Sequence, residues 1–166
     1  MIIIVMGVSG AGKSTIGRLL ADNLGWTFYD GDDYHPPSNI ENLKKGIALT
    51  DTERWPWLAT LRKIIENAID RKEHAIIACS ALKQSYREYL ANRSESVRFV
   101  YLKGEYDLIR QRVNKRKRHF IDANLLFSQC ETLEEPHDAF IIDISQSPES
   151  IVHRIKEMIM AQLYHL

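Results

Sequence analysis

The fold is decided by the stretch Gly7-Val8-Ser9-Gly10-Ala11-Gly12-Lys13-Ser14, which matches the pattern GxxxxGK[ST] at every required position. The continuous apolar run 2–6 precedes it, and residues 14–24 follow with apolar side chains at helical spacing. A glycine-rich loop between a strand and a helix turns backbone N–H groups inward, and these hold phosphates together with the helix N-terminus. The sequence therefore predicts a phosphate-binding loop for a nucleoside triphosphate, with ATP as the favoured ligand.

Two side chains of this loop have predicted roles. We expect Lys13 to bridge the terminal phosphates of ATP and to take part in catalysis, and Ser14 to offer its hydroxyl to Mg²⁺. The residues expected to contact ATP are Gly7, Val8, Ser9, Gly10, Ala11, Gly12, Lys13, Ser14 and Thr15. GTPases, motor ATPases and small-molecule kinases share such a loop, so the loop alone does not define the reaction.

Length and charge narrow the class of protein. The chain has 166 residues, which predicts one domain, and its 22 Lys and Arg balance its 22 Asp and Glu. A protein that binds mainly nucleic acid usually carries a basic excess, so no nucleic-acid partner is expected. No apolar run approaches the ~20 residues of a membrane span, so no membrane partner is expected either. Two cysteines without a CxxC pattern favour a reduced, cytoplasmic setting.

Short β-branched runs alternate with helical patterns along the whole chain. The predicted strands are 2–6, 26–30, 74–79, 97–102 and 139–144. The predicted helices are 14–24, 57–68, 82–90, 106–113, 123–133 and a last helix that begins near Pro148. This alternation predicts an α/β fold, a P-loop NTPase-type three-layer sandwich with a five-stranded parallel sheet. Ligands of such sheets bind at the carboxyl ends of the strands.

An acidic turn, Asp30-Gly31-Asp32-Asp33, follows the second predicted strand. The third strand ends without an aspartate, and no NKxD sequence is present to read a guanine base, which argues against a GTPase. In compact kinases a carboxylate after the second strand can lie near the metal instead. We expect Asp30 near Mg²⁺ and Asp32 as the base that accepts the proton of a substrate hydroxyl, although the two roles could be reversed.

Six of the nine residues from 110 to 118 are basic. They could form a solvated helix face, a weak nucleic-acid patch, or a lid that closes over ATP and excludes water. The phosphate loop and the zero net charge favour a lid near 114–124. In that interpretation Arg112 and Arg116 contact ATP, and Arg116 and Arg118 act in catalysis. Which of the three arginines touches the γ-phosphate stays open.

The sequence resembles the small P-loop gluconokinases, which are related to shikimate kinase. The resemblance is carried by the phosphate loop and by more specific stretches, Asp30-Gly31-Asp32-Asp33-Tyr34-His35-Pro36 and Cys79-Ser80-Ala81-Leu82-Lys83 followed by Tyr86-Arg87. Further matching stretches continue in family order to about Pro136. One departure is Arg118, which stands where the family commonly has glycine before its His-Phe pair.

The resemblance implies a kinase of one domain, 1–166, that transfers the γ-phosphoryl group of ATP to the 6-hydroxyl of D-gluconate. A substrate-binding helical segment near 36–60, a helical lid and a homodimer are implied with it. The residues expected to bind gluconate are Asp32, His35, Arg54, Lys83, Arg87 and His119. Arg54, Arg87 and Lys83 are the candidates for the carboxylate, because a cationic side chain, best a planar guanidinium, holds that group. Arg54 is the first choice, by analogy with shikimate kinase.

Each of these expected roles has a simpler alternative. His35 could simply end a turn, and Arg54 and Arg87 could form surface salt bridges. The acceptor could instead be another sugar acid or a shikimate-like molecule. The protein could also be a nucleotide-binding switch instead of a kinase. Discrimination between gluconate and its epimers is not readable from the sequence.

Overall fold

The computed structural model describes residues 1–115 and 123–164. The elements follow one another as β1 (Ile2–Met6), α1 (Lys13–Leu24), β2 (Thr27–Asp30), the 3-10 turn η1 (Gly31–Tyr34), α2 (Pro37–Lys44), α3 (Asp51–Asp70), β3 (Ala75–Ala78), α4 (Gln84–Ala91), β4 (Val97–Lys103), α5 (Tyr106–Lys115), α6 (Ala123–Thr132), β5 (Phe140–Asp143) and α7 (Pro148–Tyr164). Each predicted strand and helix is present, with bounds that differ mostly by one or two residues.

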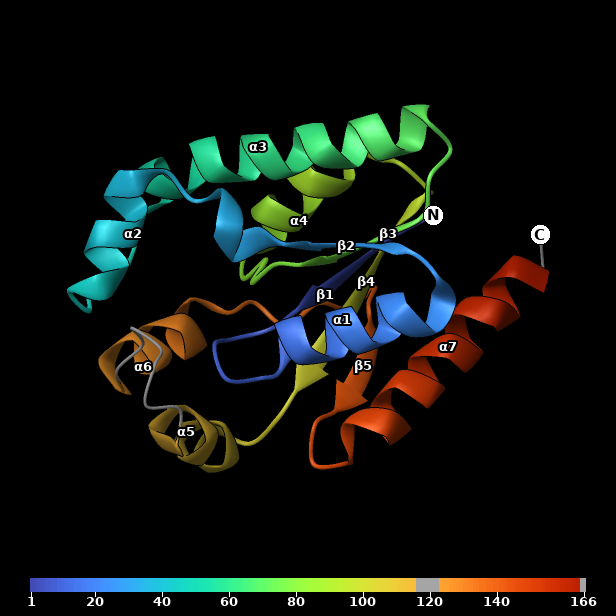
Figure 1. The fold of residues 1–166 in the computed structure, drawn as a ribbon. Helices are drawn as coiled ribbons and strands as arrows, with labels where there is room; N and C mark the ends of the chain where they lie inside the picture. Colours follow the sequence, from blue (N-terminus) through green and yellow to red (C-terminus); the bar gives the residue numbers. More distant parts are fainter. Residues whose placement is uncertain (116–122, 165–166) are drawn as a thin grey trace.

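The five strands form one parallel sheet in the order β2-β3-β1-β4-β5. Helices α3 and α4 cover one face of the sheet, and α1 and α7 cover the other (Figure 1). The predicted α/β three-layer sandwich is therefore confirmed. Helices α2 and α6 lie at the end of the sheet where the loop between β1 and α1 projects (Figure 1).

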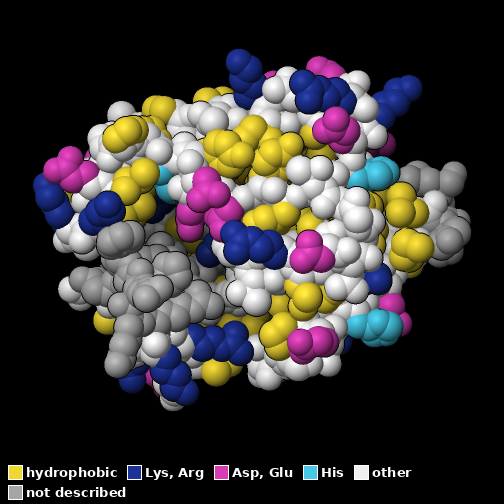
Figure 2. Space-filling model, in the orientation of Figure 1, with side chains coloured by type: hydrophobic (Ala, Val, Ile, Leu, Met, Phe, Trp, Pro, Cys, Tyr) yellow, Lys and Arg dark blue, Asp and Glu magenta, His cyan; other side chains and the backbone are white. Residues whose placement is uncertain are grey.

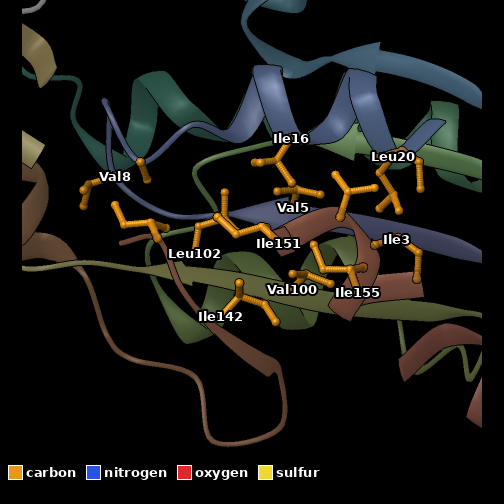
Figure 3. Packing of buried hydrophobic residues seen from close by; sticks show 14 of the residues in the cluster. Ile3, Val5, Val8, Ile16, Leu20, Val100, Leu102, Ile142, Ile151 and Ile155 are labelled. Carbon is orange, nitrogen blue, oxygen red and sulfur yellow. The ribbon is translucent and has the colours of Figure 1, made fainter. Parts of the chain in front are cut away.

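The central strand β1 supplies both halves of the core. Ile3 and Val5 point to the side of α1 and α7, where Figure 3 shows them among Ile16, Leu20 and Ile155. The alternate residues of β1, which are Ile2, Ile4 and Met6, pack with α3 and α4 on the opposite face. Successive side chains of a strand point to opposite faces, so a strand covered on both sides is apolar throughout. This explains the continuous apolar run that precedes the phosphate loop.

Helix α3 begins at Asp51, six residues before the start that the apolar spacing predicted. Thr50 caps the helix, and Thr50 and Glu53 form a capping box that satisfies backbone N–H groups at the N-terminus. Pro56 lies inside the helix, where its missing N–H removes only one backbone hydrogen bond. The early start puts Arg54 on the helix. Residues 36–60 comprise α2, the connection to α3 and the first half of α3, whereas most of the predicted lid lies outside the described residues.

The carboxyl ends of β1 and β3 are tied together directly. The N–H of Gly7, which begins the phosphate loop, donates to the carbonyl oxygen of Ser80 at 3.3 Å. Residues that follow β1, β2 and β3 therefore surround one region at this edge of the sheet. No helix in the described part of the chain is both long enough and apolar enough to cross a membrane.

Candidate active site

The phosphate loop has a conformation that only glycine adopts readily. The φ angles of Gly10 and Gly12 are +82° and +98°. A Cβ on Gly10 would lie 2.6 Å from Cγ2 of Val113, so α5 also packs too closely for any other residue. Gly12 stands at the N-terminus of α1, where no side chain forms a cap. The positive end of the α1 dipole is thus left uncapped by side chains, as an anion site requires.

Side-chain contacts also hold the loop. The Nζ atom of Lys13 donates to the carbonyl oxygen of Val8 at 3.0 Å. The lysine side chain therefore folds back onto the loop that precedes it. The N–H of Ser9 donates to Oε1 of Gln129 on α6 at 2.8 Å. Gln129 had no predicted role. Gln129 is 120 residues from Ser9 in the chain, so no local sequence pattern predicts this contact.

Ser14 and Asp30 are in direct contact. The Ser14 hydroxyl donates to Oδ2 of Asp30 at 2.7 Å, and Oδ1 of Asp30 accepts from the N–H of Asp32 at 3.1 Å. A hydroxyl and a carboxylate side by side are oxygen ligands of the kind that Mg²⁺ prefers. No group of three or more His, Cys, Asp or Glu able to hold a metal occurs among the described residues. Ser14 and Asp30 therefore fit a Mg²⁺ ion, which they would hold together with phosphate oxygens and water.

Asp32 lies next to a buried histidine. The Asp32 side chain is 77% exposed, and its Oδ1 lies 3.9 Å from Nε2 of His35, whose side chain is 7% exposed. His35 stacks on Trp57 with ring centroids 4.2 Å apart, and Trp57 Nε1 donates to the carbonyl oxygen of Gly31 at 2.7 Å. Burial lowers the pKa of His35 more than Asp32 raises it. The His35 imidazole is therefore neutral at pH 7. The hydrogen bond from Trp57 to Gly31 attaches the acidic turn to α3.

Arg54 brings a buried positive charge to the same region. Its side chain lies on α3, only 9% of the residue is exposed, and its Nη1 donates to the hydroxyl of Tyr86 at 3.2 Å. Across residues 1–115 and 123–164, no carboxylate oxygen lies within 4.0 Å of the Arg54 guanidinium. A buried guanidinium without a carboxylate partner is suited to an anionic ligand.

These groups line one cleft of about 990 Å³. Its walls include Lys13, Ser14, Asp30, Asp32, His35, Arg54, Trp57 and Gln129, together with Arg18 of α1 and the apolar Ile40 and Leu43 of α2. On the face drawn in Figure 2, acidic, basic and apolar side chains alternate without a broad patch of either charge. The cleft thus combines a phosphate-binding end, the three carboxylates of Asp30, Asp32 and Asp33, and a buried cation.

The structure does not bring Lys83 and Arg87 into this cleft. Lys83 Nζ lies 3.1 Å from both carboxylate oxygens of Asp51, outside the lining residues. Arg87 is buried, and its guanidinium donates to the carbonyl oxygens of Ala81 at 2.8 Å and Glu134 at 2.8 Å. Further donors of Arg87 bind the carbonyl of Leu82 and the side chain of Gln84. The donors of Arg87 join the loop before α4 to the segment after α6, and its expected role in substrate binding stays a prediction.

The basic segment is only partly described. Arg112 Nη2 donates to the carbonyl oxygen of Ile144 at 2.8 Å, and Arg112 is not among the residues that line the cleft. The contact ties α5 to the end of β5, and the expected contact of Arg112 with ATP stays a prediction. Arg116, Arg118 and His119 lie outside the described residues, and their roles stay predictions.

Two more residues near the site had no predicted role. Asp51 and Tyr86 hydrogen-bond each other, and Tyr86 also accepts from Arg54. Tyr86 belongs to a stretch that carries the resemblance, and Asp51 belongs to a further matching stretch, Leu49-Thr50-Asp51. This was the one signal in the sequence that pointed to them. A role for either residue depends on Arg54, so it could be recognised only after the helices were placed.

Comparisons with known proteins agree with this geometry. The family profile described as shikimate kinase matches residues 9–160. A probable gluconokinase of Xenopus tropicalis is 40% identical over 94% of this chain and 92% of its own. The thermoresistant gluconokinase of Escherichia coli strain K12 is 40% identical over 95% of this chain and 93% of its own. The crystal structure of a gluconokinase from Sinorhizobium meliloti 1021 superposes with a TM-score of 0.83, at 37% identity, over 96% of this chain and 95% of that one. The chain, with its phosphate loop, acidic turn and buried arginine around one cleft, belongs to the gluconokinase family within the wider shikimate kinase family.

Proposed function

We propose that this protein transfers the γ-phosphoryl group of ATP to the 6-hydroxyl of D-gluconate. The observation that carries the proposal is the buried Arg54, which has no carboxylate partner among the described residues and lines the same cleft as the phosphate loop. Gluconate is a polyol with a carboxylate at one end and a primary hydroxyl at the other. A cleft with a cation and a phosphate loop suits such an acceptor. The gluconokinases matched over nearly their full length support the same acceptor.

The phosphate end of the cleft performs binding and charge stabilisation. Backbone N–H groups at the N-terminus of α1 and the Lys13 ammonium hold the phosphates and stabilise the charge that moves to the leaving group. Ser14 and Asp30 would hold Mg²⁺, whose chemistry is to neutralise charge on the terminal phosphate oxygens. Lys13 must leave the Val8 carbonyl or share its donors to do this, since its Nζ contacts that oxygen.

The acceptor end of the cleft performs positioning and proton transfer. The exposed carboxylate of Asp32 accepts the proton of the attacking hydroxyl, while the neutral His35 beside it supplies a hydrogen-bond partner for the polyol. The hydroxyl oxygen forms a bond to the γ-phosphorus as the bond to the bridging oxygen of ADP breaks, in line. Arg54 holds the carboxylate of the acceptor, which keeps the reacting hydroxyl near the phosphate.

Lid closure over ATP, with Arg116 and Arg118 near the γ-phosphate, remains part of the proposal. Expulsion of water by such a lid would prevent ATP hydrolysis without an acceptor. The hydrogen bond of Arg112 to the carbonyl oxygen of Ile144 joins α5 to the residue that follows β5. A homodimer in the cytoplasm is proposed from the resemblance alone, and light scattering on the purified protein tests the oligomeric state.

A coupled assay of ADP release tests the proposed function. MgATP is offered with gluconate, idonate, galactonate, shikimate, glucose or AMP as the acceptor. We expect strong stimulation by gluconate and weak stimulation by the other molecules. Stimulation by another member would keep the kinase mechanism and change the acceptor. Slow ATP hydrolysis without stimulation by any member would contradict the proposal and favour a nucleotide-binding switch.

A further inference from the structure

Tyr86 contacts Arg54 but is not among the residues that line the cleft. The residue is 1% exposed and sits on α4, whereas Arg54 sits on α3. Its hydroxyl accepts from Nη1 of Arg54 at 3.2 Å and donates to Oδ1 of Asp51. Lys83 completes the group, since its Nζ lies 3.1 Å from each oxygen of the Asp51 carboxylate. The arrangement is a chain of contacts from Lys83 through Asp51 and Tyr86 to Arg54.

The direction of the hydrogen bonds follows from the number of protons. A phenol has one O–H proton and accepts with its oxygen lone pairs. An ionised Asp51 can only accept, so the Tyr86 proton points to Asp51 and the lone pairs remain for the guanidinium. Hydrogen bonds from Tyr86 and Lys83 lower the pKa of Asp51, which keeps this carboxylate ionised. The orientation of the Tyr86 hydroxyl is therefore determined by Asp51.

We propose that Tyr86 and Asp51 form a positioning pair that holds the Arg54 guanidinium in the cleft wall for the anionic end of the acceptor. The inference rests on the proposed function and extends it to residues that do not touch the substrate. A carboxylate in direct contact with Arg54 would compete with the carboxylate of the substrate. The neutral phenol holds the guanidinium in place without neutralising it.

The donor count of Arg54 supports this role. A guanidinium has five N–H donors in a planar fork, and the hydrogen bond to Tyr86 uses one of them. The remaining donors are enough for two parallel hydrogen bonds to a carboxylate. Trp55 packs edge-on against the Tyr86 ring with centroids 5.4 Å apart, so the phenol itself has little freedom to move. A rigid partner places the fork before the substrate arrives, which favours binding.

Removal of the Tyr86 hydroxyl tests the inference. In Tyr86→Phe we expect the KM for gluconate to rise about tenfold, because a hydrogen bond to a charged group is lost. We expect the kcat to stay within about twofold and the KM for ATP to stay unchanged, since the phosphate end is untouched. The matched control is Tyr89→Phe, which removes a hydroxyl on the same helix from a ring that also contacts Trp55 edge-on. The control should keep the KM of the wild type.

A second variant separates positioning from a general loss of structure. In an Arg54→Lys background, Tyr86→Phe should add less than about twofold to the KM for gluconate, because the pair acts through the guanidinium. Full addition of the two effects would overturn the inference, and so would an unchanged KM in Tyr86→Phe relative to Tyr89→Phe. Failure of the proposed function has a different signature, since the wild-type protein would then fail to phosphorylate gluconate at all.

Discussion

The side-chain amide of Gln129 is joined to the backbone of Ser9 by a 2.8 Å hydrogen bond between residues 120 positions apart in the chain. Gln129 lies on α6, directly after the predicted lid, and Ser9 lies in the middle of the phosphate loop. The contact links the helix that follows the lid to the loop that holds the phosphates. It also satisfies one backbone N–H of that loop.

Loss of this contact should weaken ATP binding. In Gln129→Leu the shape of the side chain is similar but the amide is absent, so Ser9 loses its acceptor and the loop is less well ordered before ATP arrives. We expect the KM for ATP to rise about threefold to tenfold, the value of one hydrogen bond. Steady-state kinetics with varied ATP concentration measures this KM. The control is Gln111→Leu, the same change at an exposed position of α5. An unchanged or lower KM for ATP would show that Gln129 does not prepare the loop.

Replacement of the proposed base should affect turnover more than binding. Asp32→Asn keeps the size of the side chain but cannot accept the proton, so we expect the kcat to fall about 10²- to 10⁴-fold. The KM for gluconate should change little. A rise in the KM with an unchanged kcat would make Asp32 a binding residue. Asp33→Asn is the matched control, because it removes the neighbouring charge of the same acidic turn.

The Ser14–Asp30 pair predicts the response to magnesium. Asp30→Asn removes the negative charge from the pair whose oxygens lie 2.7 Å apart. We expect the half-saturating Mg²⁺ concentration to rise about tenfold or more, in line with changes around metal sites in other proteins. Activity as a function of Mg²⁺ at constant ATP measures this. The same Mg²⁺ dependence in the variant and the wild type would mean that the metal binds without Asp30.

The buried His35 predicts how stability depends on pH. Burial lowers its pKa in the folded protein, so the unfolded chain takes up the proton first as the pH falls below the ordinary value of 6.5. When the unfolded state binds more protons, the free energy of unfolding decreases as the pH decreases. This loss is absent well above pH 6.5 and grows until the folded-state pKa is reached.

Urea unfolding at pH 7.5 and pH 5.5 measures the effect. In His35→Gln, the decrease in the free energy of unfolding between the two pH values should be smaller than in the wild type. The control is His153→Gln, which changes a histidine whose side chain is 75% exposed on α7. An equal decrease in the wild type and in His35→Gln would contradict the assignment of this pH dependence to His35.

Local sequence was enough for the elements that depend on neighbouring residues. The apolar run of β1, the glycine spacing of the phosphate loop and the acidic turn after β2 are all patterns over a few positions, and the structure has them in the predicted places. Helix α3 begins six residues before its predicted start, because the prediction followed the apolar spacing from residue 57, whereas the capping box of Thr50 and Glu53 starts the helix at Asp51. Ser14 and Asp30 were each expected near Mg²⁺, and the structure places their side-chain oxygens 2.7 Å apart, because parallel strands bring their carboxyl ends to one edge.

The roles of the arginines could not be read from the sequence in the same way. Arg54 and Arg87 have the same chemistry, and both stand on helices that follow strands of the sheet. Arg54 meets a single phenol and lines the cleft, whereas Arg87 meets carbonyl oxygens from two loops. The difference depends on which polar groups surround each guanidinium, and those groups come from distant parts of the chain.

The sequence by itself determined the α/β sandwich, the phosphate loop and the acidic turn. These follow from hydrophobic periodicity, from the backbone freedom of glycine and from the alternation of strands and helices along the chain. Only the tertiary structure decided that Arg54 faces the cleft, that Arg87 and Lys83 do not, and that Gln129, Tyr86 and Asp51 support the site. The physical reason is the range of the interactions. Backbone preferences act over a few residues, whereas the partners of a buried polar side chain are chosen by the packing of whole helices.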